Sequence, residues 1–397
     1  MPPIGSAGAR RAKAGVCLLL SGCLAAETPP AADGERPPRR LQESPAEFPL
    51  QFSVIRAVMA LPDGRLVVSD PHENRIALID FPGGTRQELS RVGDGPREFR
   101  RAGGLYRGRG GRVMIFDQEL RRLLPIAPEG AVEDISGLST GGAGGSWSGR
   151  GPDHLVVDSL GHAYAAIRFG DVTAPTSVLL RHTPGARPDT MTQLLRPLTR
   201  KLENAKEMEY QEVLFSPGDG WVVSPDGRIA VVRAEPYRVE WIPLSGLTVT
   251  GPVIRHEPVP ITQAEKELIA SGAGGSRGRI SVTIGMVPAG GAAGAGSSAP
   301  SPIPVEELLF AKVKSPVNLR GGRRPMLDEN GRLWVERHVR AGVEGSVFDV
   351  FDGNGNLVDR IGLPLGSRLV GFDPQWVYLA RGDADGFDHL HRFPLPR

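Results

Sequence analysis

Short runs of apolar residues, separated by turns rich in glycine, asparagine and aspartate, recur from Phe48 to the end of the chain. In the clearest copy, Ala57–Leu61 is followed by the turn Pro62–Arg65 and then by a second apolar run, Leu66–Val68. Tight hairpin turns need residues that adopt positive φ, which Gly and Asn do at little cost, whereas β-branched and aromatic residues favour strands. The pattern predicts many short antiparallel strands and an all-β fold.

The hairpin is a repeat, and some copies add a third strand after a polar loop, such as Arg75–Asp80. Its six copies, of which the last is degenerate, are Ala57–Val68, Gly110–Phe116, His154–Ala165, Gly220–Val232, Pro325–Val335 and Leu369–Leu379. Units of three or four short strands repeated six times are typical of a β-propeller. We therefore predict a six-bladed β-propeller over residues 48–397, in which the C-terminal strand near Phe387–Phe393 shares a blade with Phe48–Val54.

Two segments interrupt the rhythm. The charged stretch Lys201–Glu212 suggests a helix, and a long insertion, residues 251–324, separates blades four and five. Within the insertion, Thr262 and Glu265 fit a capping box, which predicts a short helix to Ala270. Residues 272–302 are almost all Gly, Ala, Ser and Pro, so this part is expected to be disordered. The insertion is either a lid over the propeller axis or an inert loop.

The N-terminus has the features of a signal peptide. Arg10, Arg11 and Lys13 precede the apolar run Ala14–Leu20, which is too short to span a bilayer as a helix. The string Leu20-Ser21-Gly22-Cys23 resembles a bacterial lipobox, in which the Cys receives a diacylglycerol before cleavage. We predict a lipoprotein signal peptide over residues 1–22, lipidation of Cys23, and a disordered tether over residues 23–47.

This resemblance also implies a location. Leu24, rather than Asp, follows Cys23, which by family analogy favours the outer membrane if the cell has one. The expected location is the cell envelope, with the membrane as a partner through the lipid. Because Cys17 and Cys23 are the only two cysteines, the folded part has no disulfide and no thiolate metal ligand.

Charge argues against nucleic acid as a partner. Residues 1–22 carry three basic side chains and no acid, so their removal leaves 44 basic against 45 acidic side chains. Nucleic-acid binding needs a basic field that replaces phosphate counterions, and a near-neutral chain lacks one.

The first blade resembles a known repeat. Residues 63–76, from Asp63-Gly64-Arg65-Leu66 to Asn74-Arg75-Ile76, are similar to an NHL repeat. Gly93-Asp94-Gly95-Pro96-Arg97-Glu98-Phe99 resembles the inter-blade motif of bacterial six-bladed propeller lipoproteins. The resemblance implies the fold but not an activity, since propellers serve as binding platforms, scaffolds, lyases and lactonases.

Acidic and histidine side chains give weak candidates for chemistry. Asp70, Asp117 and Asp352 end strands of the repeat, where carboxylates usually accept hydrogen bonds from backbone N–H groups of the next loop. His389 and His391 alternate, so on a strand they share a face, either as half of a metal site or as a satisfied pair. No metal or other cofactor is predicted.

Arginines near the second blade are the candidate ligand-binding residues. Arg97 and Arg101 lie in the inter-blade loop, and Arg121 follows the second strand of the second blade. Propellers present these loops on one face, where guanidinium groups would suit an anion. The alternative is that these arginines only form part of the surface.

Two classes of function remain open. The first is an envelope-anchored binding module for a protein or for a small molecule such as an anion. The second is an enzyme with a site in the central tunnel, of the metal-dependent lactonase or lyase type. Such enzymes need acids, Asn or His on the innermost strands, whereas Ala57–Leu61 and Leu155–Val157 are aliphatic. This favours the binding module.

Overall fold

The computed structural model of the chain describes residues 37–41, 46–89, 91–117, 119–120, 122–134, 155–183, 185–201, 210–271, 305–319, 323–340 and 343–397. These ranges are mostly β-strand, and the helices they contain are α1 (Gln263–Ala270) and two short 3-10 turns, η1 (Arg109–Gly111) and η2 (Val305–Glu307). The predicted all-β class is confirmed.

The largest sheet joins two four-stranded meanders. Its strands, in spatial order, are β2 (Ala46–Glu47), β28 (Asp388–Pro394), β27 (Trp376–Gly382), β26 (Ser367–Phe372), β3 (Ala57–Ala60), β4 (Leu66–Asp70), β5 (Arg75–Asp80) and β6 (Thr85–Glu88). All neighbours are antiparallel except β26 and β3, which pair in parallel through Gly371 with Val58 and Phe372 with Met59. The parallel contact joins the first strands of two separate meanders.

Four further sheets each contain one meander, and in one of them β1 is added at the outer edge. They consist of β7 (Ala102–Arg107), β8 (Val113–Asp117) and β9 (Arg122–Ile126); β10 (Leu155–Val157), β11 (Ala163–Ile167), β12 (Thr176–His182) and β13 (Asp189–Leu195); β16 (Gly220–Val223), β17 (Ile229–Ala234), β18 (Tyr237–Ile242) and β19 (Val249–Thr250); and β22 (Met326–Leu327), β23 (Leu333–Arg337), β24 (Val347–Phe351), β25 (Leu357–Gly362) and β1 (Arg39–Arg40).

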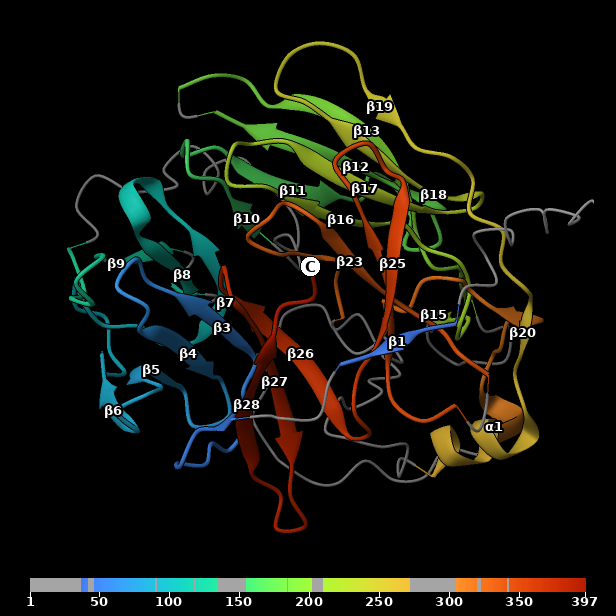
Figure 1. The fold of residues 1–397 in the computed structure, drawn as a ribbon. Coiled ribbons are helices and arrows are strands. Elements are labelled where there is room, and N and C mark those ends of the chain that lie inside the picture. Colours follow the sequence, from blue (N-terminus) through green and yellow to red (C-terminus); the bar gives the residue numbers. More distant parts are fainter. Residues whose placement is uncertain are drawn as a thin grey trace, which may run out of the picture.

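The meanders have a propeller-like arrangement. Figure 1 shows β3, β7, β10, β16 and β26 around the centre of the molecule, with later strands of each meander farther out. The first strands β3, β7, β10 and β16 contact one another in chain order, and β26 pairs with β3. We call the line around which the first strands are arranged the axis.

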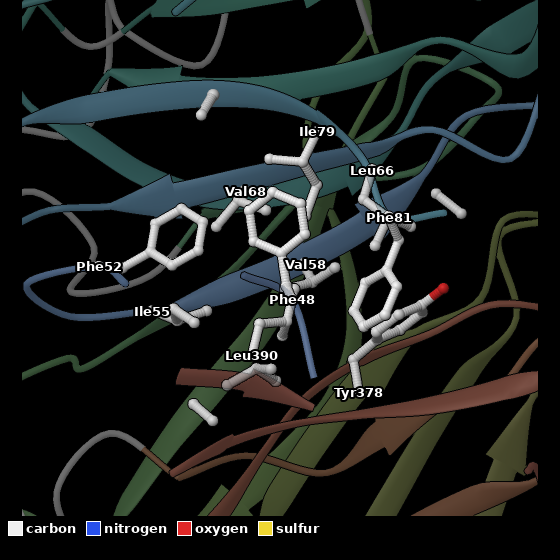
Figure 2. Close-up of a cluster of buried hydrophobic side chains, with 14 residues drawn as sticks. Phe48, Phe52, Ile55, Val58, Leu66, Val68, Ile79, Phe81, Tyr378 and Leu390 are labelled. Carbon is white, nitrogen blue, oxygen red and sulfur yellow. The ribbon is translucent and has the colours of Figure 1, made fainter. Parts of the chain in front are cut away.

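The core lies between neighbouring meanders rather than at one centre. In the cluster of Figure 2, Phe48, Ile79 and Phe81 pack with Tyr378 and Leu390, which come from the other end of the chain. The rings of Phe48 and Phe81 lie 5.7 Å apart. Comparable apolar clusters join the other neighbouring meanders, so each sheet buries both of its faces.

The two ends of the chain close the ring of sheets, as predicted. Ala46–Glu47 pairs antiparallel with Arg392 and His391 of β28. The backbone N–H of Phe52 donates to the carbonyl of Asp388 at 2.9 Å. The N-terminal segment thus supplies the outer strand of the last meander, and this covers an edge that would otherwise be open to pairing with another chain.

The tether prediction needs correction at its C-terminal end. Arg39–Arg40 pairs in parallel with Ile361 and Gly362 of β25, and Leu41 is buried in the core. Residues 39–41 and 46–47 therefore belong to the folded part, because they satisfy the outer strands of two meanders. Residues 23–36 and 42–45 lie outside the described residues, as does the signal peptide.

The helix predicted over Lys201–Glu212 is wrong at both ends of the segment. Thr199–Lys201 forms β14, Tyr210–Glu212 forms β15, and the two strands pair antiparallel. Sheet pairing decides these residues, although the charged composition is compatible with a helix. Residues 202–209 between them lie outside the described residues.

The described part of the segment 251–324 contains the predicted helix. Thr262 caps α1, and Thr262 and Glu265 form the reciprocal capping box. Beside it, β20 (Val259–Pro260) pairs with β21 (Val313–Lys314). Figure 1 shows α1 at the periphery, beyond β15 and near β20, and not over the centre. The lid hypothesis, which placed this helix above the axis, is therefore wrong; residues 272–304 lie outside the described residues.

Candidate functional site

The predicted arginine cluster is held by carboxylates. Arg97 Nε lies 3.0 Å from Asp134 Oδ1, and both side chains are largely exposed. Arg100, its neighbour in the loop, pairs with Asp94 and, at 2.9 Å, with Glu119. Hydrogen bonding from Arg100 lowers the pKa of Asp94, so both groups stay charged. These arginines have their anions within the protein.

Of the other two predicted residues, Arg101 belongs to the described part of the chain. Its backbone N–H donates to Asp117 Oδ1 at 3.3 Å, and its side chain is exposed just before β7. Arg121 lies outside the described residues, and so does Cys23. A ligand site formed by Arg97, Arg101 and Arg121 therefore stays a prediction.

Asp117 holds the backbone of the inter-blade loop around Arg100 and of the turn that follows β8. Its buried carboxylate accepts from the backbone N–H of Arg100 at 2.8 Å and from those of Glu119 and Leu120, each at 3.1 Å. Asp70 does the same for His72 and Glu73 and also accepts from Ser53 N at 2.9 Å. The predicted structural role of these strand-end carboxylates is confirmed.

A different set of cations lies near the axis. Tyr106 of β7 folds back along its own strand over Gly104, where an added Cβ would lie 2.6 Å from the Tyr106 hydroxyl oxygen. Burial raises the pKa of Tyr106 to about 12, while the positive charges of Arg324 and Arg56 oppose that rise. Tyr106 is therefore a neutral phenol at physiological pH, with two guanidinium groups near its hydroxyl.

These two arginines come from opposite ends of the sequence. Arg56 immediately precedes β3, and Arg324 lies two residues before β22. Both positions lead into first strands, which surround the axis (Figure 1), and Tyr106 belongs to a first strand as well, β7. We call Arg56, Tyr106 and Arg324 the axial cluster. Within the described residues, Arg56 is exposed and forms no ion pair.

Hydrogen bonds and an ion pair hold the chain segments that carry Arg56 and Arg324. The N–H of Ile55 donates to the buried carboxylate of Asp388 at 2.8 Å, and the N–H of Arg56 donates to Ser69 O at 2.9 Å. On the other side, Arg323 pairs with Glu336 at 2.8 Å. Arg323 is thus engaged by β23, while the charge of its neighbour Arg324 acts on Tyr106.

The C-terminal residue of β7 forms an ion pair that links two meanders. Arg107, next to Tyr106, pairs with Glu329 in the turn between β22 and β23 and also donates to the carbonyl of Ala60. The guanidinium of Arg107 is therefore neutralised by the protein.

The axial cluster suits an oxyanion. Guanidinium groups donate forked hydrogen bonds to carboxylate or phosphate, and a neutral phenol adds one O–H donor. It does not fit a divalent cation, which needs several oxygen or imidazole ligands. Among the described residues, no three His, Cys, Asp or Glu side chains gather closely enough to hold a metal ion.

The histidine pair of β28 has a different arrangement from the one considered for a metal. His389 Nδ1 lies 2.9 Å from Glu47 and Nε2 lies 2.9 Å from Asp383, so carboxylates occupy both ring nitrogens. Hydrogen bonding to Asp383 and Glu47 raises the pKa of His389, despite partial burial. Burial lowers the pKa of His391, so the two side chains differ in environment.

Sequence reasoning missed the axial cluster, although a signal for it was present. Basic residues stand just before or at the start of four first strands: Arg56, Arg101, Arg324 and Arg368. Basic residues beside first strands are a signal for cations near the axis, because the first strands surround it. The four positions differ in register relative to their strands, so the sequence does not show which of these side chains lie together. The spacing of arginines within one loop gives no information about this arrangement.

Comparison with known proteins gives only distant structural likenesses. No family model matches the chain, and no curated protein matches it. Solved structures that resemble it include a candidate exported protein from Bacteroides fragilis, with 9% identity over 90% of this chain and 95% of that one and a TM-score of 0.44. A candidate gluconolactonase shares 12% identity over 89% and 94%, with a TM-score of 0.42.

A further likeness is to the calcium-binding protein regucalcin from Agrobacterium tumefaciens, with 12% identity over 91% of this chain and 97% of that one and a TM-score of 0.37. With TM-scores below 0.5, these likenesses carry no argument about what this chain binds or catalyses. In the described ranges no helix is both long and apolar enough to cross a bilayer.

Proposed function

We propose that the protein is a lipid-anchored, six-bladed β-propeller of the cell envelope that binds a small oxyanion at its axial cluster. Six blades are supported by six first strands, each of which begins a meander: β3, β7, β10, β16, β22 and β26. Lipidation of Cys23 is supported by the lipobox-like string Leu20–Cys23. The outer membrane is the proposed location in a diderm cell.

The observation that carries the ligand proposal is that the positive charges of Arg56 and Arg324 both act on Tyr106. In the proposed ring, their blades are separated from each other by the blade of β26, and Tyr106 comes from the blade on the far side of β3. Two positive charges that act on one region raise the electrostatic potential there, which favours an anion. A carboxylate or phosphate placed there would accept from both guanidiniums and from the phenol.

Titration calorimetry of the purified chain tests this proposal. The probes are phosphate, sulfate and a set of aliphatic and aromatic carboxylates, measured on the parent and on Arg324→Gln. Hydrogen bonds to charged groups contribute about 1.5–3 kcal/mol, so Arg324→Gln should weaken binding by roughly 10- to 150-fold. If none of these anions binds the parent, or if the variant binds equally well, the proposal is wrong.

A metal-dependent lactonase or lyase stays the second candidate function. Among the described residues, no cluster of His, Cys, Asp or Glu supports its metal site. This candidate predicts turnover of lactones or of cyclic esters that depends on an added divalent metal. The same protein preparations, assayed for ring opening with and without Mg²⁺ or Ca²⁺, separate the two classes. Metal-dependent turnover that survives Arg324→Gln would replace the binding proposal.

A further inference from the structure

One outer edge of the molecule is unusually apolar. The edge of the β16–β19 meander exposes four aliphatic side chains within ten residues: Leu244 at 36%, Leu247 at 91%, Val249 at 43% and Val253 at 55%. The corresponding edge strand β6 is polar and has the sequence Thr-Arg-Gln-Glu. Single exposed aliphatic residues are normal, but a group on one edge marks a contact surface.

These side chains lie on and around a short edge strand. Val249 belongs to β19, where it pairs with Trp241 of β18, and Leu247 and Val253 lie on either side of this strand in the sequence. Gly251 follows β19, and a Cβ there would lie 2.4 Å from the carbonyl oxygen of Gly355. The apolar edge therefore adjoins the turn that leads into β25.

The N-terminal segment docks on that same neighbour. β25 carries β1 on its outer side, and Figure 1 shows β25 between β19 and β1. Arg39 of β1 pairs with Asp359, whereas Arg40 is exposed. Exposed cations beside an apolar surface favour anionic lipid headgroups. The N-terminal segment thus docks on the meander that adjoins the apolar edge.

The length of the remaining chain limits how far the fold can stand from its anchor. Pro37, the first described residue, lies fourteen positions after Cys23 in the sequence. At most about 3.6 Å per residue, this segment reaches roughly 50 Å when fully extended and much less on average. A lipid on Cys23 therefore holds the β1 side of the molecule near the bilayer.

From these observations we infer that the apolar edge, Leu244, Leu247, Val249 and Val253, rests on the bilayer to which the chain is anchored. The inference rests on the proposed lipid anchor and adds an orientation to it. A bilayer is the occupant we propose, because the anchor brings it to this side of the molecule and the exposed Arg40 suits its headgroups. A second copy of the chain is the competing occupant.

Single-cysteine labelling of the lipidated protein tests the inference. The native thiols do not interfere, because Cys17 lies in the predicted signal peptide and Cys23 would carry the lipid. Leu247→Cys and, as the matched control on the polar edge, Gln87→Cys are each labelled with a fluorophore. The labelled proteins are mixed with vesicles of phosphatidylethanolamine and phosphatidylglycerol that contain a brominated phospholipid, and sedimentation measures the bound fraction.

We expect strong quenching and a blue shift for the label at position 247, and neither at position 87, with equal sedimentation of both proteins. Protein that sediments with vesicles but gives equal signals at the two positions overturns the orientation while leaving the anchor intact. Protein that stays in the supernatant overturns the anchor and the orientation with it. A blue shift at position 247 that depends on protein concentration without vesicles assigns the edge to a second copy and overturns the bilayer contact.

Discussion

The inter-blade loop around Arg97 and the axial cluster both concentrate arginine, but their surroundings differ. In the loop, Arg97 faces Asp134, and Arg100 faces Asp94 and Glu119. Near the axis, the charges of Arg56 and Arg324 act on the neutral phenol of Tyr106. A cluster of arginines in the sequence therefore indicates a ligand only after the protein's own carboxylates have been assigned.

Removing the carboxylate that organises the loop should have the largest effect on stability. Asp117→Ala leaves four backbone N–H groups without their acceptor in a buried place. We expect a loss of about 2–4 kcal/mol in the free energy of unfolding, measured by urea denaturation. Anion affinity of the protein that remains folded should be unchanged, and a parental stability would show that the loop is not built on Asp117.

Filling the space that Gly104 leaves for the Tyr106 hydroxyl should change ligand binding at the axial cluster. Gly104→Ala places a methyl group where the hydroxyl lies, so the phenol must move. We expect about a fivefold to tenfold loss of oxyanion affinity, since one neutral hydrogen bond contributes about 1 kcal/mol. Tyr106→Phe should give a similar loss by calorimetry.

The double variant of these two positions provides the control. If Gly104→Ala acts only by displacing the hydroxyl, combining it with Tyr106→Phe should add little further loss. Fully additive losses would show that the glycine acts by another route.

The pairing of His389 with Glu47 and Asp383 should make the free energy of unfolding depend on pH. The two carboxylates around His389 raise its pKa above 6.5 in the folded state, so this contribution is complete below pH 6.5 and declines as pH rises through the folded value. Neutral imidazole has one N–H and cannot donate to both Glu47 and Asp383. Thermal unfolding from pH 5 to 9 should therefore show a decline that Asp383→Asn reduces, and an unchanged profile in that variant would exclude this cause.

Breaking an exposed pair of the loop should have the smallest effect. Arg97 and Asp134 are both largely exposed, and such pairs contribute about 0–1 kcal/mol. Arg97→Gln should change the urea midpoint little and the anion affinity not at all. A loss of affinity comparable to that of Arg324→Gln would return the ligand to the inter-blade loop.

The elements that follow from local chemistry could be predicted from the sequence. Turn residues such as Gly64 mark the hairpins, and the capping box of Thr262 and Glu265 marks α1, because each depends on neighbours in the chain. The closing pair β2–β28 followed from the need to cover an edge. Strand pairing of β1 and β14 was missed, because tertiary contacts determine it and the local composition suggests something else.

The axial cluster depends on contacts that span most of the chain. Arg56 and Arg324 are far apart in sequence, and only the closure of the sheets around the axis brings their charges to Tyr106. The space that Gly104 leaves for the hydroxyl is likewise a property of the folded strand. The sequence shows that basic residues stand beside first strands, but not which of their side chains come together in the folded chain.

The most direct test of the central claim compares two double variants for binding of the tightest oxyanion found in the calorimetric screen. Arg56→Gln/Arg324→Gln removes both cations of the axial cluster, and Arg97→Gln/Arg101→Gln removes two arginines of the inter-blade loop. We predict that the axial double variant loses detectable binding while its urea midpoint stays close to that of the parent, and that the loop double variant binds like the parent. Retained binding in the axial double variant, or lost binding in the loop double variant, would contradict the assignment of the ligand to the axis.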